Sequence, residues 1–173
     1  QRGPRLRIVR TRAHHQRGDD PRATHYLVDV LNQLGFKAKE KIIDASIYWQ
    51  TIGNQATKAQ IGFADWFQDY PHPLDWMDVL LNGNRITQTH NNNYSNYDNK
   101  VTNAKIEALK KQPTLTYDVN SQWGNLDAQI MQQAPWAPFL NRQFVDTFNE
   151  DIDLSCYQNH VLYEFDFATI CHK

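Results

Sequence analysis

The chain has 173 residues, which is enough for one domain of ordinary size. Apolar residues make up 40% of the chain and charged residues 21%, so the composition excludes a disordered polypeptide. The formal net charge of −1 provides no overall field that would favour nucleic acid, and no apolar run approaches the roughly 18 residues needed to span a membrane.

The first quarter of the chain predicts a strand, a helix and a second strand. A strand over 6–11 precedes a helix that begins at Asp20 and Pro21, and Gly35 is placed to end that helix. Apolar residues recur at three- and four-residue steps through the helix, and a second strand follows over 36–43. This order indicates a βαβ unit with a parallel strand pair and a right-handed crossover.

The same pattern then repeats. Asp44 can cap a helix that runs to Asn54, and a third strand is expected over 60–66. Three apolar side chains of that helix are expected to face the interior: Ile47, Tyr48 and Ile52.

Helices predominate in the next part of the chain. A short helix is expected over 74–81, and the polar, Asn-rich stretch 82–99 is expected to be a surface loop. Two further helices are expected over 100–111, capped by Asp98, and over 116–133. The longer one carries an apolar stripe formed by Val119, Trp123, Leu126 and Ile130.

The last part of the chain is expected to be extended. Two prolines forbid a helix over 134–138, and strands are expected over 143–148 and 161–170. The order of elements predicts a three-layer α/β domain, in which ligands bind at the C-terminal ends of the strands.

Two features leave alternatives open. Arginines crowd the first seventeen residues, either as a solvated strand edge and loop or as a phosphate-binding arm; they are Arg2, Arg5, Arg7, Arg10, Arg12 and Arg17. Cys156 and Cys171 either form a disulfide or remain two separate buried thiols. The chain opens on Gln1 directly before a strand, as we would expect of a piece of a longer protein.

The segment 63–73 carries the most specific chemistry. It follows a predicted strand, and two prolines stiffen it around Asp69. A carboxylate between aromatic side chains is a good receptor for an ammonium group, and Trp66 or Tyr70 could add cation–π attraction. The alternative is that Asp69 only caps the turn or the following helix.

This segment also carries a resemblance. Trp66-x-x-Asp69-Tyr70-Pro71-x-Pro73 resembles the W-x-x-D-Y-x-x-P signature in the C-terminal lobe of family 5, the peptide/nickel/opine class of ABC-transporter solute-binding proteins. Further stretches resemble that family in order and spacing over roughly residues 5–150: 26–36, Tyr48-Trp49, Asn96-Tyr97-Asp98, Trp123 to Asp127 with Ile130, and 134–138. Gln133 departs from the family, which often has Asp before the Ala-Pro pair.

The resemblance implies a fold and a site. It implies that residues 1–173 form a single C-terminal lobe with the type II periplasmic-binding-protein fold, and that 135–173 returns toward the hinge or the other lobe. In peptide-binding relatives the aspartate of this signature holds the α-ammonium of the peptide, a role that carries over to Asp69. Trp66 and Tyr70 would complete the ligand-binding set.

The resemblance also implies a function without catalysis. The protein would bind peptides or other amine-bearing solutes outside the membrane, attached to the cell surface, and deliver them to ABC permease subunits; an N-terminal lobe would complete the cleft. The alternative is the same lobe in a sensory protein, fused to a signalling or transcriptional module. A lone lobe offers half a cleft, so we expect it to bind solute weakly or not at all.

Enzymatic, metal and cofactor functions are not expected. The seven histidines show no H-x-x-x-H spacing, no Cys-x-x-Cys is present, and neither cysteine has a catalytic context. Asp65 and Asp69 could imitate an acid/base pair, but on a strand and a turn they are expected to point apart.

Overall fold

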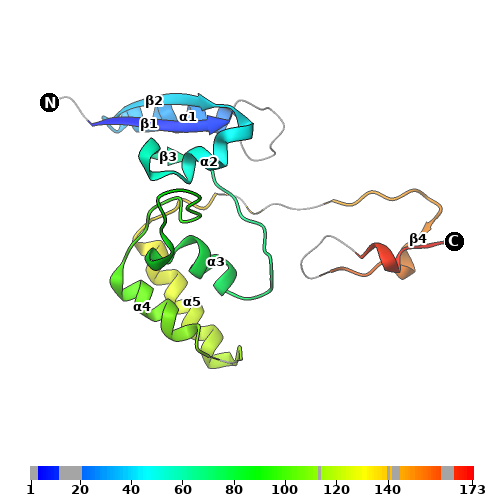
Figure 1. The fold of residues 1–173 in the computed structure, drawn as a ribbon. Helices are drawn as coiled ribbons and strands as arrows, with labels where there is room; N and C mark the ends of the chain where they lie inside the picture. Colours follow the sequence, from blue (N-terminus) through cyan, green and yellow to red (C-terminus); the bar gives the residue numbers. More distant parts are fainter. Residues whose placement is uncertain (1–3, 12–20, 113, 140, 142–144, 161–165) are drawn as a thin grey trace.

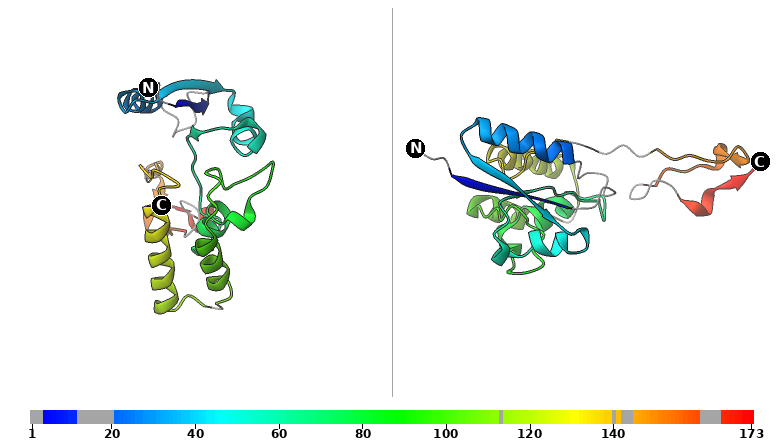
Figure 2. Two further views of the ribbon diagram at one scale, coloured as in Figure 1. Left: turned by 90° about the vertical axis from the view of Figure 1, so that its left-hand side faces the viewer. Right: turned by 90° about the horizontal axis from the view of Figure 1, so that it is seen from above.

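A computed structural model describes residues 4–11, 21–112, 114–139, 141, 145–160 and 166–173. An α/β part lies above a helical part in Figure 1, and the C-terminal segment extends to one side of both. The left view of Figure 2 again shows the α/β part above the helical part, and the right view, from above, shows the C-terminal segment clear of the main body.

The α/β part is built on a parallel sheet with the strand order β2-β1-β3. Its elements are β1 (Arg5–Thr11), α1 (Pro21–Gln33), β2 (Lys37–Ile43) and β3 (Ile61–Gly62). The predicted βαβ unit is therefore confirmed. Gly35 has a φ of +89°, and backbone bonds from Gly35 to Asn32 and from Phe36 to Leu31 close α1 in a Schellman motif.

Both faces of the sheet are covered near its centre. Ile8 and Val9 are adjacent and so point to opposite faces, yet each is buried. The Val9 face packs against Tyr48 and Ile52 of α2 (Tyr48–Ile52), and α1 contacts β1 and β2 (Figure 1). The sheet thus lies between helices, as the three-layer α/β prediction requires.

Two expectations for this part were wrong. Ile47 is half exposed, because a 3₁₀ turn over Ala45–Ile47 precedes α2 and shifts the inward face to start at Tyr48. The third strand is only Ile61–Gly62, not 60–66. The Phe63 carbonyl accepts a 2.7 Å hydrogen bond from the Tyr48 hydroxyl, so the chain leaves the ladder there.

The helical part contains α3 (Leu74–Leu80), α4 (Lys100–Leu109) and α5 (Tyr117–Gln132). Its core is formed by side chains from all three helices and from Leu81: Met77, Leu80, Leu81, Ile106, Leu109, Val119, Trp123, Leu126 and Ile130. The predicted stripe of α5 is therefore confirmed. The cap of α4 is Asn99, not Asp98, because the Asn99 side chain reaches two backbone N–H groups while Asp98 accepts a bond from Asn103.

The Asn-rich segment 82–99 is a loop, but it is not simply a surface loop. Asn82, Asn91 and Asn93 are buried. The Asn93 side chain accepts from the Tyr97 N–H at 3.0 Å and donates to the Tyr97 carbonyl at 2.9 Å. The buried amides thus satisfy backbone groups that would otherwise lack partners.

A buried carboxylate links α3 to α4. Asp78 accepts hydrogen bonds from Arg85 (Nη2 at 2.5 Å), Asn82 (2.7 Å) and Lys110 (3.1 Å). Burial alone would raise the pKa of Asp78, but these donors outweigh it and lower that pKa below its ordinary value. The ionised form is therefore favoured more strongly in the folded protein than in the unfolded chain.

We expect Asp78→Asn to lower the free energy of unfolding at pH 7 by about 2 kcal/mol, because Arg85 and Lys110 lose their shared carboxylate. A lowered folded-state pKa gives stability that is present above the unfolded pKa of about 4 and disappears as the pH falls through the folded pKa. Urea denaturation should therefore show the gap to the wild type shrinking below about pH 4. The exposed Asp127→Asn is the control; a gap that does not change with pH would contradict this account.

The C-terminal segment forms a small unit of its own. β4 (Ile152–Asp153) and β5 (Cys171–His172) pair antiparallel, and Cys156 and Cys171 form a disulfide. The segment 135–139 is irregular, and Ala134 has a left-handed φ of 49° at the end of α5.

The two strands predicted in this segment are not found where the structure describes it. Residues 145–148 have no strand, and residues 161–165 lie outside the described part. Residues 167–169 form a 3₁₀ turn, since Asp166 accepts a 2.9 Å hydrogen bond from the Ala168 N–H and turns the chain. The alternation of apolar residues does not reveal that the Asp166 side chain competes with strand pairing for this backbone N–H.

Removing the disulfide should loosen this unit alone. Replacing both cysteines by serine removes a cross-link between residues 15 apart in sequence, which stabilises the folded state by about 3 kcal/mol in the chain-entropy model. We expect amide exchange in β4 and β5 to accelerate strongly while α4 and α5 keep their protection. Equal acceleration in α5 would show that the unit is not independent.

Across the described residues, no helix combines the length and the apolar character needed to cross a membrane.

Candidate functional site

The corner between β3 and α3, residues 63–73, is the candidate site. Trp66 packs partly against the core of the helical part, whereas Asp69 is exposed and Tyr70 is 43% exposed. The Tyr70 carbonyl accepts from the His72 N–H at 2.8 Å, and the His72 carbonyl accepts from the Asp75 N–H at 3.0 Å. The corner is thus fixed to the first turn of α3 by backbone bonds.

Asp75 clamps the corner from inside. Its carboxylate is 1% exposed, and Oδ2 accepts hydrogen bonds from the Asp69 N–H at 2.9 Å and from the Trp66 indole N–H at 3.3 Å. These bonds join the backbone of one predicted site residue to the side chain of another. Asp75 was not predicted as a site residue; the available signal was an acidic residue in the first turn of a helix that follows a proline-rich turn.

The Asp69 carboxylate faces solvent and has no hydrogen-bonding role within the described part of the chain. Within the described part of the chain no hydrogen bond or ion pair involves it, and α3 has no side-chain cap. The capping role considered as an alternative for Asp69 is therefore not observed. The carboxylate is therefore exposed to solvent.

The electrostatic environment of the corner is negative. The pKa of Tyr70 is raised, first by burial and then by the neighbouring carboxylates of Asp75, Asp78 and Asp69. Tyr70 therefore remains a neutral phenol at physiological pH. An exposed carboxylate, a neutral phenol and an indole edge form a surface that favours a cation such as an ammonium group.

Metal binding has little support in the described residues. The one group of potential ligands there is Asp153, Cys156 and Cys171, and both cysteines are in the disulfide and offer no thiolate. His14 and His15 lie outside the described residues, and the His72 ring accepts a 3.0 Å hydrogen bond from the Leu74 N–H.

No protein-family model matches the chain, and no curated protein sequence matches it. Solved structures do match. The clavulanic acid biosynthesis oligopeptide-binding protein 2 aligns over 99% of this chain and 31% of its own, with a TM-score of 0.83 and 18% identity. The periplasmic binding protein DppA from Helicobacter pylori, in complex with the peptide STSA, aligns over 78% of this chain and 25% of its own, with a TM-score of 0.68 and 16% identity.

The chain has the fold of part of a peptide-binding protein. A dipeptide-binding protein from a Pseudoalteromonas species, in complex with Met-Leu, gives the same result at a TM-score of 0.64 and 15% identity, over 78% of this chain and 26% of that one. The chain spans about a quarter to a third of the length of these three structures. The α/β fold expected from the sequence is thus confirmed, and these neighbours are binding proteins rather than enzymes.

Removing the Asp75 carboxylate should free the corner. In Asp75→Ala the Asp69 N–H loses its acceptor, so its exchange with solvent should accelerate by about tenfold or more. Asp75→Asn keeps an acceptor oxygen and should preserve most of the protection. Hydrogen exchange followed by NMR measures this, with the Val119 amide at the start of α5 as an unaffected reference. Unchanged exchange at Asp69 in the Ala variant would rule out the clamp.

Proposed function

We propose that the chain is the C-terminal lobe of a family 5 extracytoplasmic solute-binding protein that binds peptides or other amine-bearing solutes for an ABC import system. One observation carries this proposal: an exposed carboxylate without a partner in the described chain, at Asp69, stands on a corner fixed by the buried Asp75. The shared fold with proteins that are named as peptide-binding supports it.

The binding chemistry follows from the corner. The ligand's ammonium group would pair with Asp69 in a charge-assisted hydrogen bond, and Trp66 and Tyr70 would cover the adjacent apolar surface. No cofactor and no catalytic residue is needed. Contacts of one ligand to two lobes favour the closed state over the open one, because only the closed state makes both sets of contacts.

A companion lobe is required by this proposal. It would complete the cleft from the N-terminal side of the longer protein, and 135–173 would return toward the hinge or that lobe. Figure 1 is compatible with such a path, since the segment after α5 leaves the helical part and extends away from it. The closed protein would then dock on permease subunits outside the membrane, in the periplasm or attached to the cell surface.

A disulfide supports the extracytoplasmic location. Disulfides persist in oxidising compartments and are rare in the cytosol, and Cys156 and Cys171 are paired here. The sensory alternative would use the same corner and is distinguished by what is fused to the lobe. A DNA-binding or signalling module would favour sensing, and a lipid-attachment cysteine would favour transport.

The test is calorimetric titration of the two-lobed protein with a short peptide and with its N-acetylated form. We expect the free amine to be preferred by about tenfold or more, because acetylation removes the positive charge that Asp69 would receive. The isolated chain should bind either peptide weakly or not at all. Equal affinities in the two-lobed protein would contradict the proposed site.

A further inference from the structure

The amino-terminal end of the sheet carries a second charged surface, remote in the fold from the corner. A hollow of about 530 Å³ lies there, lined by Arg5, Leu6, Arg7, Lys37, Lys39 and Gln60. Arg5 and Lys37 are the first residues of β1 and β2, whereas the candidate site follows the carboxyl end of β3. The two surfaces therefore belong to opposite ends of the sheet.

Strand register places the four cations together. Arg5 lies opposite Lys37, and Arg7 lies opposite Lys39, in the parallel pairing of β1 with β2. Because alternate residues share a face, all four project from the same side of the sheet. Neighbouring strands are about 5 Å apart and alternate residues about 6.6 Å apart, so the Cα atoms of the four residues form a compact rectangle.

Among the described residues, these four cations have no counterion. None of the four side chains makes a hydrogen bond or ion pair in the described part of the chain. The acidic residue of β2, Glu40, points to the other face and pairs with Arg10. Four like charges carried on adjacent positions of one sheet face repel one another, which favours an anion that neutralises them.

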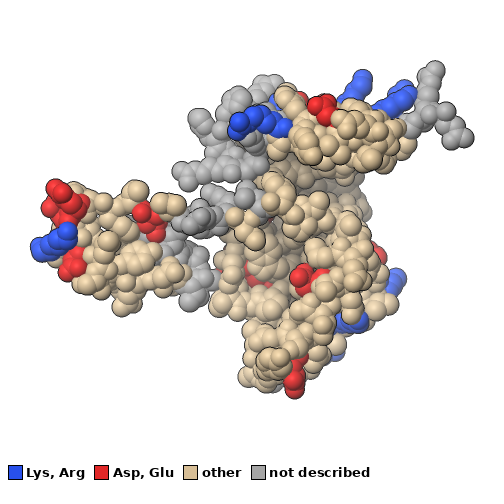
Figure 3. All heavy atoms as spheres, turned by 180° about the vertical axis from the view of Figure 1, so that it is seen from behind, with Lys and Arg blue, Asp and Glu red and all other residues tan. Residues whose placement is uncertain are grey.

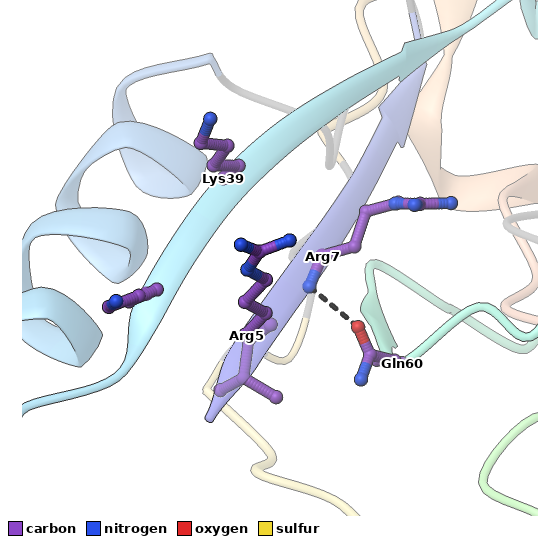
Figure 4. A pocket seen from close by; sticks show the side chains of 6 residues that line it. Arg5, Arg7, Lys39 and Gln60 are labelled. Atoms are coloured by element: carbon purple, nitrogen blue, oxygen red, sulfur yellow. Dashed lines mark hydrogen bonds between the residues drawn. The ribbon is translucent and has the colours of Figure 1, made fainter. Parts of the chain in front are cut away.

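The hollow presents hydrogen-bond donors and few acceptors. Figure 4 shows Arg5 and Arg7 on β1, Lys39 on β2, and the Gln60 side chain, whose Oε1 accepts from the Arg7 N–H at 2.7 Å. That bond leaves the Gln60 amide N–H₂ as a further donor. An arginine guanidinium can donate two parallel hydrogen bonds to a pair of phosphate oxygens, and each lysine adds a compact positive charge.

The hollow gathers basic residues although the net charge of the chain is only −1. In Figure 3 basic side chains stand along the α/β part and also on the helical part, whereas acidic side chains predominate on the C-terminal segment. We propose that the hollow formed by Arg5, Arg7, Lys37 and Lys39 is a second binding site, for an anion carrying two or more phosphate groups.

This site is independent of the proposed peptide corner, and its test uses the 173-residue chain. Sodium tripolyphosphate is titrated at low salt into the wild type, into Arg7→Gln/Lys39→Gln, and into the charge-matched control Lys100→Gln/Lys111→Gln on and just after α4. We expect about tenfold weaker binding in the first double variant and about twofold or less in the control, because only the first removes facing charges. Arg5→Gln/Lys37→Gln should repeat the loss, and thermal denaturation confirms that each variant is folded.

A second arm distinguishes a free oligophosphate from a lipid headgroup. Co-sedimentation with phosphatidylcholine vesicles, with and without phosphatidic acid, is measured for the same proteins. Binding in either arm that is lost in both hollow variants and kept in the control supports the site. Binding by the wild type in neither arm, or an equal loss in the control, would overturn it.

Discussion

Replacing Asp69 by asparagine should weaken binding of free-amine peptides to the two-lobed protein by about 30-fold to 100-fold. Asparagine has nearly the same shape and keeps an acceptor oxygen, so the loss reports the charge rather than the packing. Peptides with an acetylated amine should bind the variant and the wild type equally, because they carry no ammonium group for the carboxylate to receive. Calorimetric titration with both ligands measures this difference.

The control for this variant is Asp127→Asn, which neutralises an exposed carboxylate on α5. It changes the net charge by the same amount, so long-range effects on a cationic ligand appear in both variants. The site assignment fails if both variants lose affinity equally, or if Asp69→Asn weakens the acetylated peptide as much as the free one.

Truncating Trp123 should cost the largest amount of stability. Its side chain is 2% exposed in the core of the helical part, and its ring meets His72 edge to face at 6.0 Å. Trp123→Ala should lower the free energy of unfolding by about 3–5 kcal/mol, because a large cavity opens between α3, α4 and α5. Urea denaturation measures the loss.

Two variants bracket this result. Tyr117→Ala removes an aromatic side chain that is 86% exposed on the same helix, and should change stability by about 0.5 kcal/mol or less. Trp123→Phe should cost less than alanine, in part because the buried indole N–H has no hydrogen-bond partner in the described chain. A Trp123→Ala protein as stable as Tyr117→Ala would show that this core is wrongly placed.

The elements predicted well from the sequence are those whose signals are local. The stop of α1 at Gly35 needs a left-handed residue, and the stripe of α5 needs only a helical period, so both were found. The βαβ order restricts the pairing of β1 with β2 to a parallel one, and the structure has that pairing.

The features that could not be predicted from the sequence depend on contacts that residue types and spacing do not reveal. β3 ends early because the Tyr48 hydroxyl takes the Phe63 carbonyl, a contact fifteen residues apart. The buried asparagines of 82–99 were expected to be solvent-exposed, because their polar residue type does not show that their side chains satisfy backbone groups in the interior. Asp75 was missed for the same reason, because its role depends on the fold bringing the Trp66 indole N–H and the Asp69 N–H within hydrogen-bonding distance of its carboxylate.

The candidate site was predicted by residue type and turn chemistry. The sequence placed Asp69 on a proline-stiffened turn, and the structure shows it exposed there; the role of this residue in ligand binding stays a prediction that rests on the resemblance. Spacing alone did not show that a second carboxylate lies beneath the corner, nor that the cations of β1 and β2 stand in register on one face.

A crystal structure of the two-lobed protein with a bound peptide tests the central claim most directly. We expect the peptide's amino nitrogen to lie about 2.7–2.9 Å from an Asp69 carboxylate oxygen, with the Asp75 clamp in place and the cleft closed over the ligand. A peptide whose amine is held by another carboxylate, with Asp69 facing open solvent, would contradict the account.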